Sequence, residues 1–336
     1  MEQPLVSRSS TPPRRIPAPL LKFVLRRIVL GVVIMFVISI LVFVATQALP
    51  GDAAVAKLGR AATPVALAAF RAHYHLSEPA IEQYFSWLGD LLQGKLGYSL
   101  SAPESVTTLI GQRIGNSVVL LLFASLIGIP IAIALGIVSA KRRDGVFDHA
   151  TSFAILGLAG LPEFVIGISL TLLLATNVVH ILPATSLLNP QQSIWSQLKL
   201  VLLPAFTLAI AIAPYIVRMT RASMIEALES DYVAMARLKG VRERRVLLRY
   251  AFPNASAPTF QAIALSLAYL MGGAVVVETV FQYPGVGLAL VSAIQNRDLP
   301  TIQALVLLIT LVYLTVSIAA DVLTTIMTPR LRTQMK

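Results

Sequence analysis

The sequence lacks cysteine and is poor in charged residues, and each shortage excludes a class of protein. Without cysteine there is no disulfide framework, thiolate metal site or cysteine nucleophile. Lys, Arg, Asp and Glu make up only 13% of the 336 residues, against roughly a quarter in soluble proteins. We find no serine–histidine–aspartate set, no paired acids and no metal-ligand cluster. The sequence therefore predicts neither an enzyme nor a resident cofactor or metal.

Long apolar stretches are abundant instead, and 56% of the residues are hydrophobic. A helix that crosses the hydrocarbon core of a bilayer needs about 20 mainly apolar residues. Six stretches meet this requirement: residues 28–49, 114–140, 150–176, 200–217, 260–277 and 302–327. The fold class predicted is all-α, a polytopic membrane protein with six transmembrane helices.

The net charge of +11 is explained by membrane topology rather than by nucleic-acid binding. Of the 27 Lys and Arg residues, 20 lie in the N-terminal segment, the turn 141–148, the loop 218–259 and the tail. Basic segments between spans mark the cytoplasmic side. We therefore expect a multi-pass protein of the bacterial cytoplasmic (inner) membrane with both termini in the cytoplasm.

Three regions follow from this layout. Residues 1–20 are rich in Pro and Ser and predict a disordered cytoplasmic extension. Residues 21–113 hold the first transmembrane helix and a long extracytoplasmic segment, in which we expect short helices on the outer membrane surface. Residues 114–336 form the core transmembrane domain.

The stretch GDLLQGK, starting at Gly89, resembles a phosphate-binding loop at first sight. Such a loop needs Ser or Thr after its lysine and a strand leading into it. Here Leu96 follows Lys95, and the preceding apolar residues have helical spacing. We interpret the segment as an amphipathic helix ended by Gly94.

The loop 218–259 is the most informative segment. Ser223 and Glu226 have the spacing of a capping box, and Gly240 is a natural helix C-terminus, where we expect the left-handed conformation. A second basic helix is expected to follow, limited by Pro253. The periodicity alone leaves two interpretations open: a hairpin presented to a partner protein, and a solvated charged hairpin.

This loop, DYVAMARLKGVRERRVLLRYAFPNA, resembles the cytoplasmic loop of permease subunits of bacterial ABC importers in the oligopeptide/dipeptide/nickel group. Ala236, Gly240, Phe252 and Pro253 stand where that family has its small residue, glycine, apolar residue and proline. Three further stretches are similar: LRRIVLGVV to FVATQALPGD, EQYFSWLGDLLQGKLGYSL and GGAVVVETVFQYPGVGLALVSAI. The chain departs from the family pattern at Leu238, where alanine is common.

The resemblance implies a type I ABC-importer permease fold and a non-catalytic transmembrane subunit. Its expected partners are a second homologous permease, two cytoplasmic ABC ATPases that carry ATP and magnesium, an extracytoplasmic solute-binding protein and the lipid bilayer. The ATPase-docking residues implied by the resemblance are Asp231, Tyr232, Ala236, Lys239, Gly240, Arg244, Arg245 and Pro253.

Four residues are candidates for the pore or its gate. Glu163 is an ionisable group at membrane depth, which indicates either contact with a substrate amine or a paired structural role. Glu278 lies at the outer end of the fifth span, and the resemblance implies that the following turn, with Pro284 and Gly285, is a re-entrant or gating element. For Asp321 we expect pairing with basic loop residues.

The transported solute stays open between dipeptides, oligopeptides, opine-like amides and nickel chelates, with peptides favoured by the resemblance. The rival function is a self-sufficient secondary transporter driven by an ion gradient. That function predicts inverted repeats and coupling acids at mid-membrane. We find no repeat, and only Glu163 is suitably placed.

Overall fold

The computed structural model describes residues 18–48, 55, 62–73, 78–176 and 180–327. The regular secondary structure of the described part is helical apart from one isolated β-bridge between Tyr98 and Ser105. Its α-helices are α1 (Ala18–Gln47), α3 (Pro64–His73), α4 (Ala80–Leu92), α5 (Val106–Lys141), α6 (Val146–Ala159), α7 (Glu163–Thr171), α8 (Leu198–Leu228), α9 (Asp231–Leu238), α10 (Glu243–Arg245), α11 (Phe252–Phe281), α12 (Val286–Gln295) and α13 (Leu299–Met327). A 3₁₀ turn (Ile194–Gln197) precedes α8, and wide π turns follow α7 (Leu172–Thr176) and α10 (Val246–Ala251).

Within the described residues, five helical segments are long and apolar enough to cross a membrane, or six if one bent pair counts as a span. The five are Lys22–Gln47, Val106–Lys141, Ile194–Leu228, Glu243–Phe281 and Leu299–Val322. The expected all-helical, multi-span architecture is confirmed. The expected third span, 150–176, differs in shape, because α6 and α7 meet at an angle of 109°. Pro162 explains this break, since it cannot donate a backbone hydrogen bond.

Several helix boundaries differ from those expected from the sequence. The amide of Thr108 donates a 3.1 Å hydrogen bond to Ser105 Oγ, so α5 starts at Val106 and the expected division at 113/114 falls inside one helix. The prediction of a capping box at Ser223 is wrong. Ser223 lies inside α8 and donates to the carbonyl of Met219, because α8 continues with Met224 buried. Residues 1–17 of the expected extension lie outside the described residues.

Pro253 does not limit a separate second helix, which corrects the sequence-based expectation. The helical segment Glu243–Phe281 is continuous through the proline. Pro253 occupies the first turn of α11, directly after the wide turn Val246–Ala251. A proline is tolerated there because the first-turn amides have no partner within the helix. The helix that begins at Glu243 and the fifth span are therefore one element.

The centre of the molecule is the pair α5 and α8. Residues of α5 that face α8 recur every four positions and are all buried: Leu120, Ala124, Gly128, Ala132, Gly136 and Ala140. A methyl group on Gly136 would lie 2.7 Å from Thr220 Cβ, and one on Gly128 would lie 3.0 Å from Ala209 Cβ. Small residues allow helix backbones to approach closely within a membrane.

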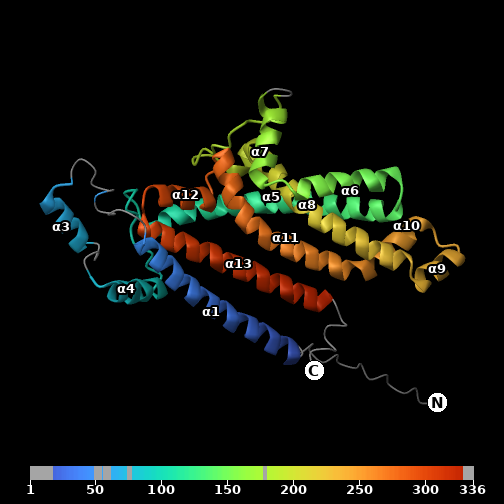
Figure 1. Cartoon of the computed structure of the whole chain (residues 1–336), viewed down its shortest axis with the longest axis horizontal. Helices are drawn as coiled ribbons and strands as arrows, with labels where there is room; N and C mark the ends of the chain where they lie inside the picture. The colour runs from blue at the N-terminus through green and yellow to red at the C-terminus, as the bar shows by residue number, and fades with distance from the viewer. Residues whose placement is uncertain (1–17, 49–54, 56–61, 74–77, 177–179, 328–336) are drawn as a thin grey trace, which may run out of the picture.

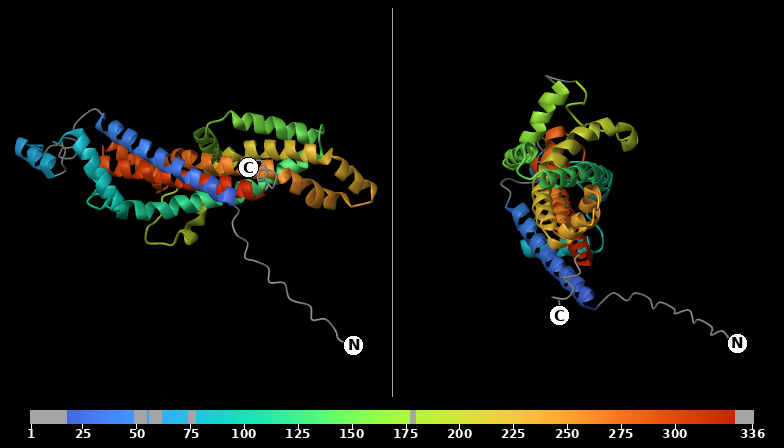
Figure 2. Two further views of the ribbon diagram at one scale, coloured as in Figure 1. Left: turned by 90° about the horizontal axis from the view of Figure 1, so that it is seen from below. Right: turned by 90° about the vertical axis from the view of Figure 1, so that its right-hand side faces the viewer.

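The helices extend between two distinct ends of the molecule (Figure 1). The hairpin of α9 and α10 lies at one end, and α3, α4 and α12 lie at the other. Helix α1 packs beside α13, as the views in Figures 1 and 2 agree. Helix α4 is held to α1 by aromatic contacts, with ring centroids of Phe43 and Tyr84 5.3 Å apart.

The segment that resembled a phosphate loop is the C-terminus of α4, as the sequence indicated. Gly94 has φ of +77°, and its amide donates to the carbonyl of Leu91 at 2.9 Å. The amide of Lys95 donates to the carbonyl of Asp90 at 2.9 Å. These two bonds form a Schellman motif, which ends the helix.

Candidate functional site

The helical hairpin of residues 229–251 is built on a Schellman motif at Gly240. The φ angle of Gly240 is +73°, which confirms the expected left-handed conformation. Its amide donates to the carbonyl of Arg237 at 2.9 Å, and the amide of Val241 donates to that of Ala236 at 3.2 Å. Across the turn, Arg237 and Glu243 form an ion pair of 2.8 Å. The corner is therefore fixed by backbone and side-chain contacts together.

A small apolar core makes the hairpin rigid. Val233 and Ala236 of α9 pack with Val246 and Ala251 of the wide turn, and all four are buried. Met224 of α8 and Ala140 of α5 belong to the same cluster. Ala236, expected to take part in docking, is thus inside the hairpin, where its small size lets the two arms close. The hairpin is packed onto the transmembrane helices rather than hanging from them.

The outer surface of the hairpin is both apolar and basic. The exposed fraction of Leu238 is 82%, that of Met235 is 55% and that of Tyr232 is 43%. The other residues expected at the docking site are also exposed: Asp231, Lys239, Gly240, Arg244, Arg245 and Pro253. We call Tyr232, Met235 and Leu238 the apolar face of the hairpin. An apolar face at an aqueous end of a membrane protein is a typical protein-binding surface.

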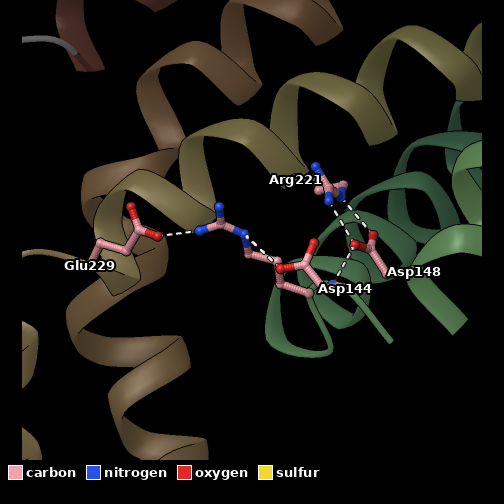
Figure 3. Close-up of polar contacts among 5 residues, drawn as sticks. Asp144, Asp148, Arg221 and Glu229 are labelled. Atoms are coloured by element: carbon pink, nitrogen blue, oxygen red, sulfur yellow. Dashed lines mark hydrogen bonds and ion pairs between the residues drawn. The ribbon is translucent and has the colours of Figure 1, made fainter. Parts of the chain in front are cut away.

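A second cluster fixes the α5–α6 turn to the end of α8 (Figure 3). Arg221 donates from Nε and Nη2 to the two carboxylate oxygens of Asp148, each at 2.6 Å. The amide of Asp144 also donates to Asp148, at 3.0 Å, and Arg143 pairs with Glu229 at the end of α8. We call these five residues the turn latch. Sequence reasoning missed it, although two acids in an otherwise basic turn were a signal.

The outer turn after α11 is organised by Glu278, whose exposed fraction is only 1%. Its carboxylate accepts hydrogen bonds from Ser117 Oγ at 2.6 Å and from the amides of Gly287 at 2.7 Å and Leu288 at 3.2 Å. Glu278 therefore caps the N-terminus of α12, where unpaired amides and the helix dipole favour a negative charge.

Pro284 and Gly285 belong to the same turn. The Pro284 carbonyl accepts from Asn116 Nδ2 at 2.8 Å, and the Tyr283 hydroxyl donates to the carbonyl of Asn116 at 2.8 Å. A methyl group on Gly285 would lie 2.3 Å from the carboxylate of Glu278, so only glycine fits. The structure thus brings together three of the four candidate gate residues and joins them to α5.

Asp298, which the sequence did not single out, ties the segment between α4 and α5 to the start of α13. Its exposed fraction is 0%, and it accepts from the hydroxyls of Ser99 and Ser101 and from the amide of Leu100 at 3.0 Å. Burial alone would raise the pKa of Asp298. The hydrogen bonds from Ser99, Leu100, Ser101 and Thr301 outweigh it and hold the pKa below its usual value.

The two remaining acids within the spans lie elsewhere. Asp321 pairs with Arg27 of α1 at 3.0 Å, so its basic partner lies at the start of the first span rather than in a loop between spans. Glu163 begins α7 and accepts a hydrogen bond from the hydroxyl of Tyr269 in α11. It does not join the outer turn.

Two family models match the chain. Residues 132–333 match "Binding-protein-dependent transport system inner membrane component", and residues 20–121 match the N-terminal model of such membrane components. The two matches together cover almost the whole described part of the chain.

Full-length relatives match as well. A Brucella suis chain whose name describes a peptide permease protein is 36% identical over 324 residues, covering 93% of this chain and 99% of the relative. The "Probable peptide ABC transporter permease protein" of Sinorhizobium fredii is 33% identical, covering 92% and 99%. The oligopeptide transport system permease protein AppB of Bacillus subtilis is 32% identical, covering 92% and 98%.

Proposed function

The chain belongs to the family of binding-protein-dependent transport system inner membrane components, and from this we propose that it forms half of a peptide-import pore completed by a homologous permease. The peptide assignment is supported by the names of the relatives, which describe permeases of peptides and oligopeptides. Dipeptides and oligopeptides are both compatible with this assignment.

The energy for import comes from separate subunits in this proposal. Two cytoplasmic ABC ATPases bind ATP and magnesium, and an extracytoplasmic solute-binding protein delivers the peptide. The single observation that carries the proposal is the cytoplasmic hairpin, with its exposed apolar face beside Lys239, Arg244 and Arg245. An apolar helix face with a basic rim fits a groove on a partner protein.

The construction of the hairpin explains how a docked ATPase would move the pore. Only Glu229 and Ser230 separate α8 from α9, and the helix from Glu243 continues without a break to Phe281. A displacement of α9 is therefore transmitted to two membrane-crossing segments as a rigid-body movement. Closure of the ATPases would pull the two Gly240 corners of the permease pair together and open the pore outward.

The orientation follows from charge and from the two ends of the molecule. The loop 218–259 and the turn 141–148 carry 11 of the 18 basic residues that lie between the N-terminal segment and the tail, which favours the cytoplasmic side for this end. Helices α4 and α12 lie at the other end (Figure 1), which in this proposal faces the binding protein. Both termini are then cytoplasmic.

The ion-driven alternative needs a coupling acid. Of the acids considered at membrane depth, Glu278 caps α12 and Asp321 pairs with Arg27, which makes Glu163 the candidate for such a role. The two functions predict different energy sources. We expect import by the reconstituted complex to require ATP and to persist when ionophores abolish proton and sodium gradients.

The docking surface is tested with two equally exposed leucines. Leu238 is 82% exposed on the hairpin, and Leu92 is 81% exposed at the end of α4. Because neither side chain is packed inside the chain, Leu238→Ser and Leu92→Ser should both fold. We expect Leu238→Ser to weaken co-purification with the ATPases about tenfold, while Leu92→Ser leaves it unchanged. Equal retention by both variants would contradict the docking assignment.

A further inference from the structure

Glu163 occupies an unusual place for a charged residue. It is the first residue of α7, immediately after the bend between α6 and α7, and the Tyr269 hydroxyl donates to its Oε1. A methyl group on Gly273 would lie 3.3 Å from Glu163 Oε1 and 3.6 Å from Leu208 Cδ2. The carboxylate therefore lies against α11 at the level of Leu208 in α8. Both Gly273 and Leu208 are inside membrane-crossing segments.

Two clefts meet beside this carboxylate. A cleft of about 650 Å³ lies between α6, α8 and α11 and is lined by Tyr269 together with Thr151, Ser152 and Ser266. A second, of about 920 Å³, lies between α1, α11 and α13 and is lined by Glu163, Tyr269 and Tyr313. Tyr269 is 56% exposed and lines both clefts, while the carboxylate it contacts lines the second.

No basic side chain in the described clefts neutralises Glu163. The basic residues that line them are Arg218 and Arg221, and Arg221 is engaged by Asp148. Arg218 follows Leu208 by ten residues in α8, which places it about 15 Å further along the helix. A carboxylate without a cation at membrane depth is costly in lipid, so its clefts must be lined with water or covered by protein.

From this geometry, and resting on the import function proposed above, we propose that Glu163 and Tyr269 form a transient site for the protonated amine of the transported peptide. The carboxylate has unused acceptor sites beyond the bond from Tyr269. The exposed phenol ring adds a surface that attracts cations. Glu163 is thus a specificity-determining residue of the translocation path, distinct from the hairpin and the outer turn.

The test separates the ammonium charge from the rest of the peptide. The full complex, with both permeases, ATPases and the binding protein, is reconstituted in liposomes. Import is measured for three peptides that differ in their ammonium groups. They are a tripeptide with uncharged side chains and a free amino terminus, its N-acetylated form, and an N-acetylated form in which one residue is lysine. Only peptides that the unchanged binding protein binds are used. For each peptide, the import rate of the variant complex is divided by that of the wild-type complex. Because both contain the same binding protein, its preference among the peptides cancels in this ratio.

For Glu163→Gln, which keeps an acceptor for Tyr269, we expect about a tenfold loss for the free and the lysine-containing peptides and less than a twofold change for the acetylated neutral peptide. Loss with the free peptide alone assigns the site to the amino terminus, and loss with both assigns it to any ammonium group. Glu163→Asp should restore most of the rate. Tyr313→Phe, a change in the same cleft, should affect all peptides equally and weakly.

Two results would overturn the proposal: an equal loss for all three peptides, which indicates a structural role, or no loss for any. Folding is checked by stimulation of ATPase activity by the loaded binding protein, which Glu163→Gln should retain. A wild-type complex without ATP-dependent import of any peptide would instead contradict the proposed function.

Discussion

Arg221 donates two parallel hydrogen bonds of 2.6 Å to Asp148, and this pair joins α8 to the first turn of α6 (Figure 3). Asp148 is buried, while the side chain of Arg221 is 29% exposed. Nearby, Arg143 of the same turn pairs with Glu229, the residue that ends α8 just before the hairpin. The turn latch therefore holds three transmembrane elements together at the point where the hairpin begins.

The latch predicts unequal effects of two charge removals. Asp148→Asn leaves the guanidinium of Arg221 without its carboxylate, and we expect a loss of about 2 kcal/mol in stability. Arg143→Gln removes an exposed ion pair and should cost less than about 1 kcal/mol. Thermal unfolding of the purified complex in detergent compares the two. Equal shifts in Tm would show that burial of Asp148 contributes nothing.

The outer turn predicts a strict requirement for glycine. A methyl group on Gly285 would overlap the carboxylate of Glu278 at 2.3 Å, so Gly285→Ala must displace the residue that caps α12. We expect a loss of about 3 kcal/mol and poor recovery of folded protein. Gly111→Ala is the control, because nothing lies within 4 Å of the added methyl group in α5. That change should be neutral or stabilising by up to about 1 kcal/mol.

Asp298 predicts a pH dependence at the outer surface. Its pKa in the folded protein is lowered, so its ionised form stabilises the contact with Ser99 and Ser101 above the unfolded pKa of about 3.9. This stabilisation is lost as the pH falls through the folded pKa. The protection factor of the Leu100 amide, which compares its exchange rate with that of an unstructured chain at the same pH, should fall at acidic pH in the wild type. In Asp298→Asn, this protection factor should already be low at pH 7 and show no such transition.

The features that the sequence predicted correctly depend on local chemistry. Hydropathy is a property of each segment, so the apolar spans could be identified without knowing their neighbours. Gly94 and Gly240 each follow a periodic helical pattern, and both adopt positive φ in Schellman motifs. The hydrogen bonds that close such a motif lie within six consecutive residues, so the local sequence is enough to predict the end of the helix.

The features that were missed or wrong depend on distant contacts. Asp148 and Arg221 are 73 residues apart, and Ser99 and Asp298 are 199 apart, so no local pattern connects them. The capping pattern at Ser223 was overridden because tertiary packing buries Met224 and carries α8 onward. Pro253 was taken as a helix end, although the wide turn before it accommodates a proline in the first turn of α11.

The strongest test of coupling compares Gly240 with Gly94, which have the same local geometry at opposite ends of the molecule. Their φ angles are +73° and +77°, each closes a Schellman motif, and nothing lies within 4 Å of an added Cβ at either position. Valine at either glycine therefore adds backbone strain of about 1–3 kcal/mol without a steric clash. Any difference between Gly240→Val and Gly94→Val reflects where the strain acts rather than how large it is.

Both variants should insert and pair with the second permease, because neither glycine contacts the α5–α8 core. We expect Gly240→Val to lose peptide uptake at least tenfold and to show reduced ATPase co-purification, or ATPase activity that no longer responds to loaded binding protein. Gly240→Val displaces the hairpin, which in the proposed mechanism transmits movement from the ATPases to α8 and α11. Gly94→Val only distorts the end of α4. The measurements are uptake, ATPase stimulation and co-purification on matched preparations. If both variants transport at the wild-type rate, the hairpin is a solvated charged loop that does not couple ATP hydrolysis to transport.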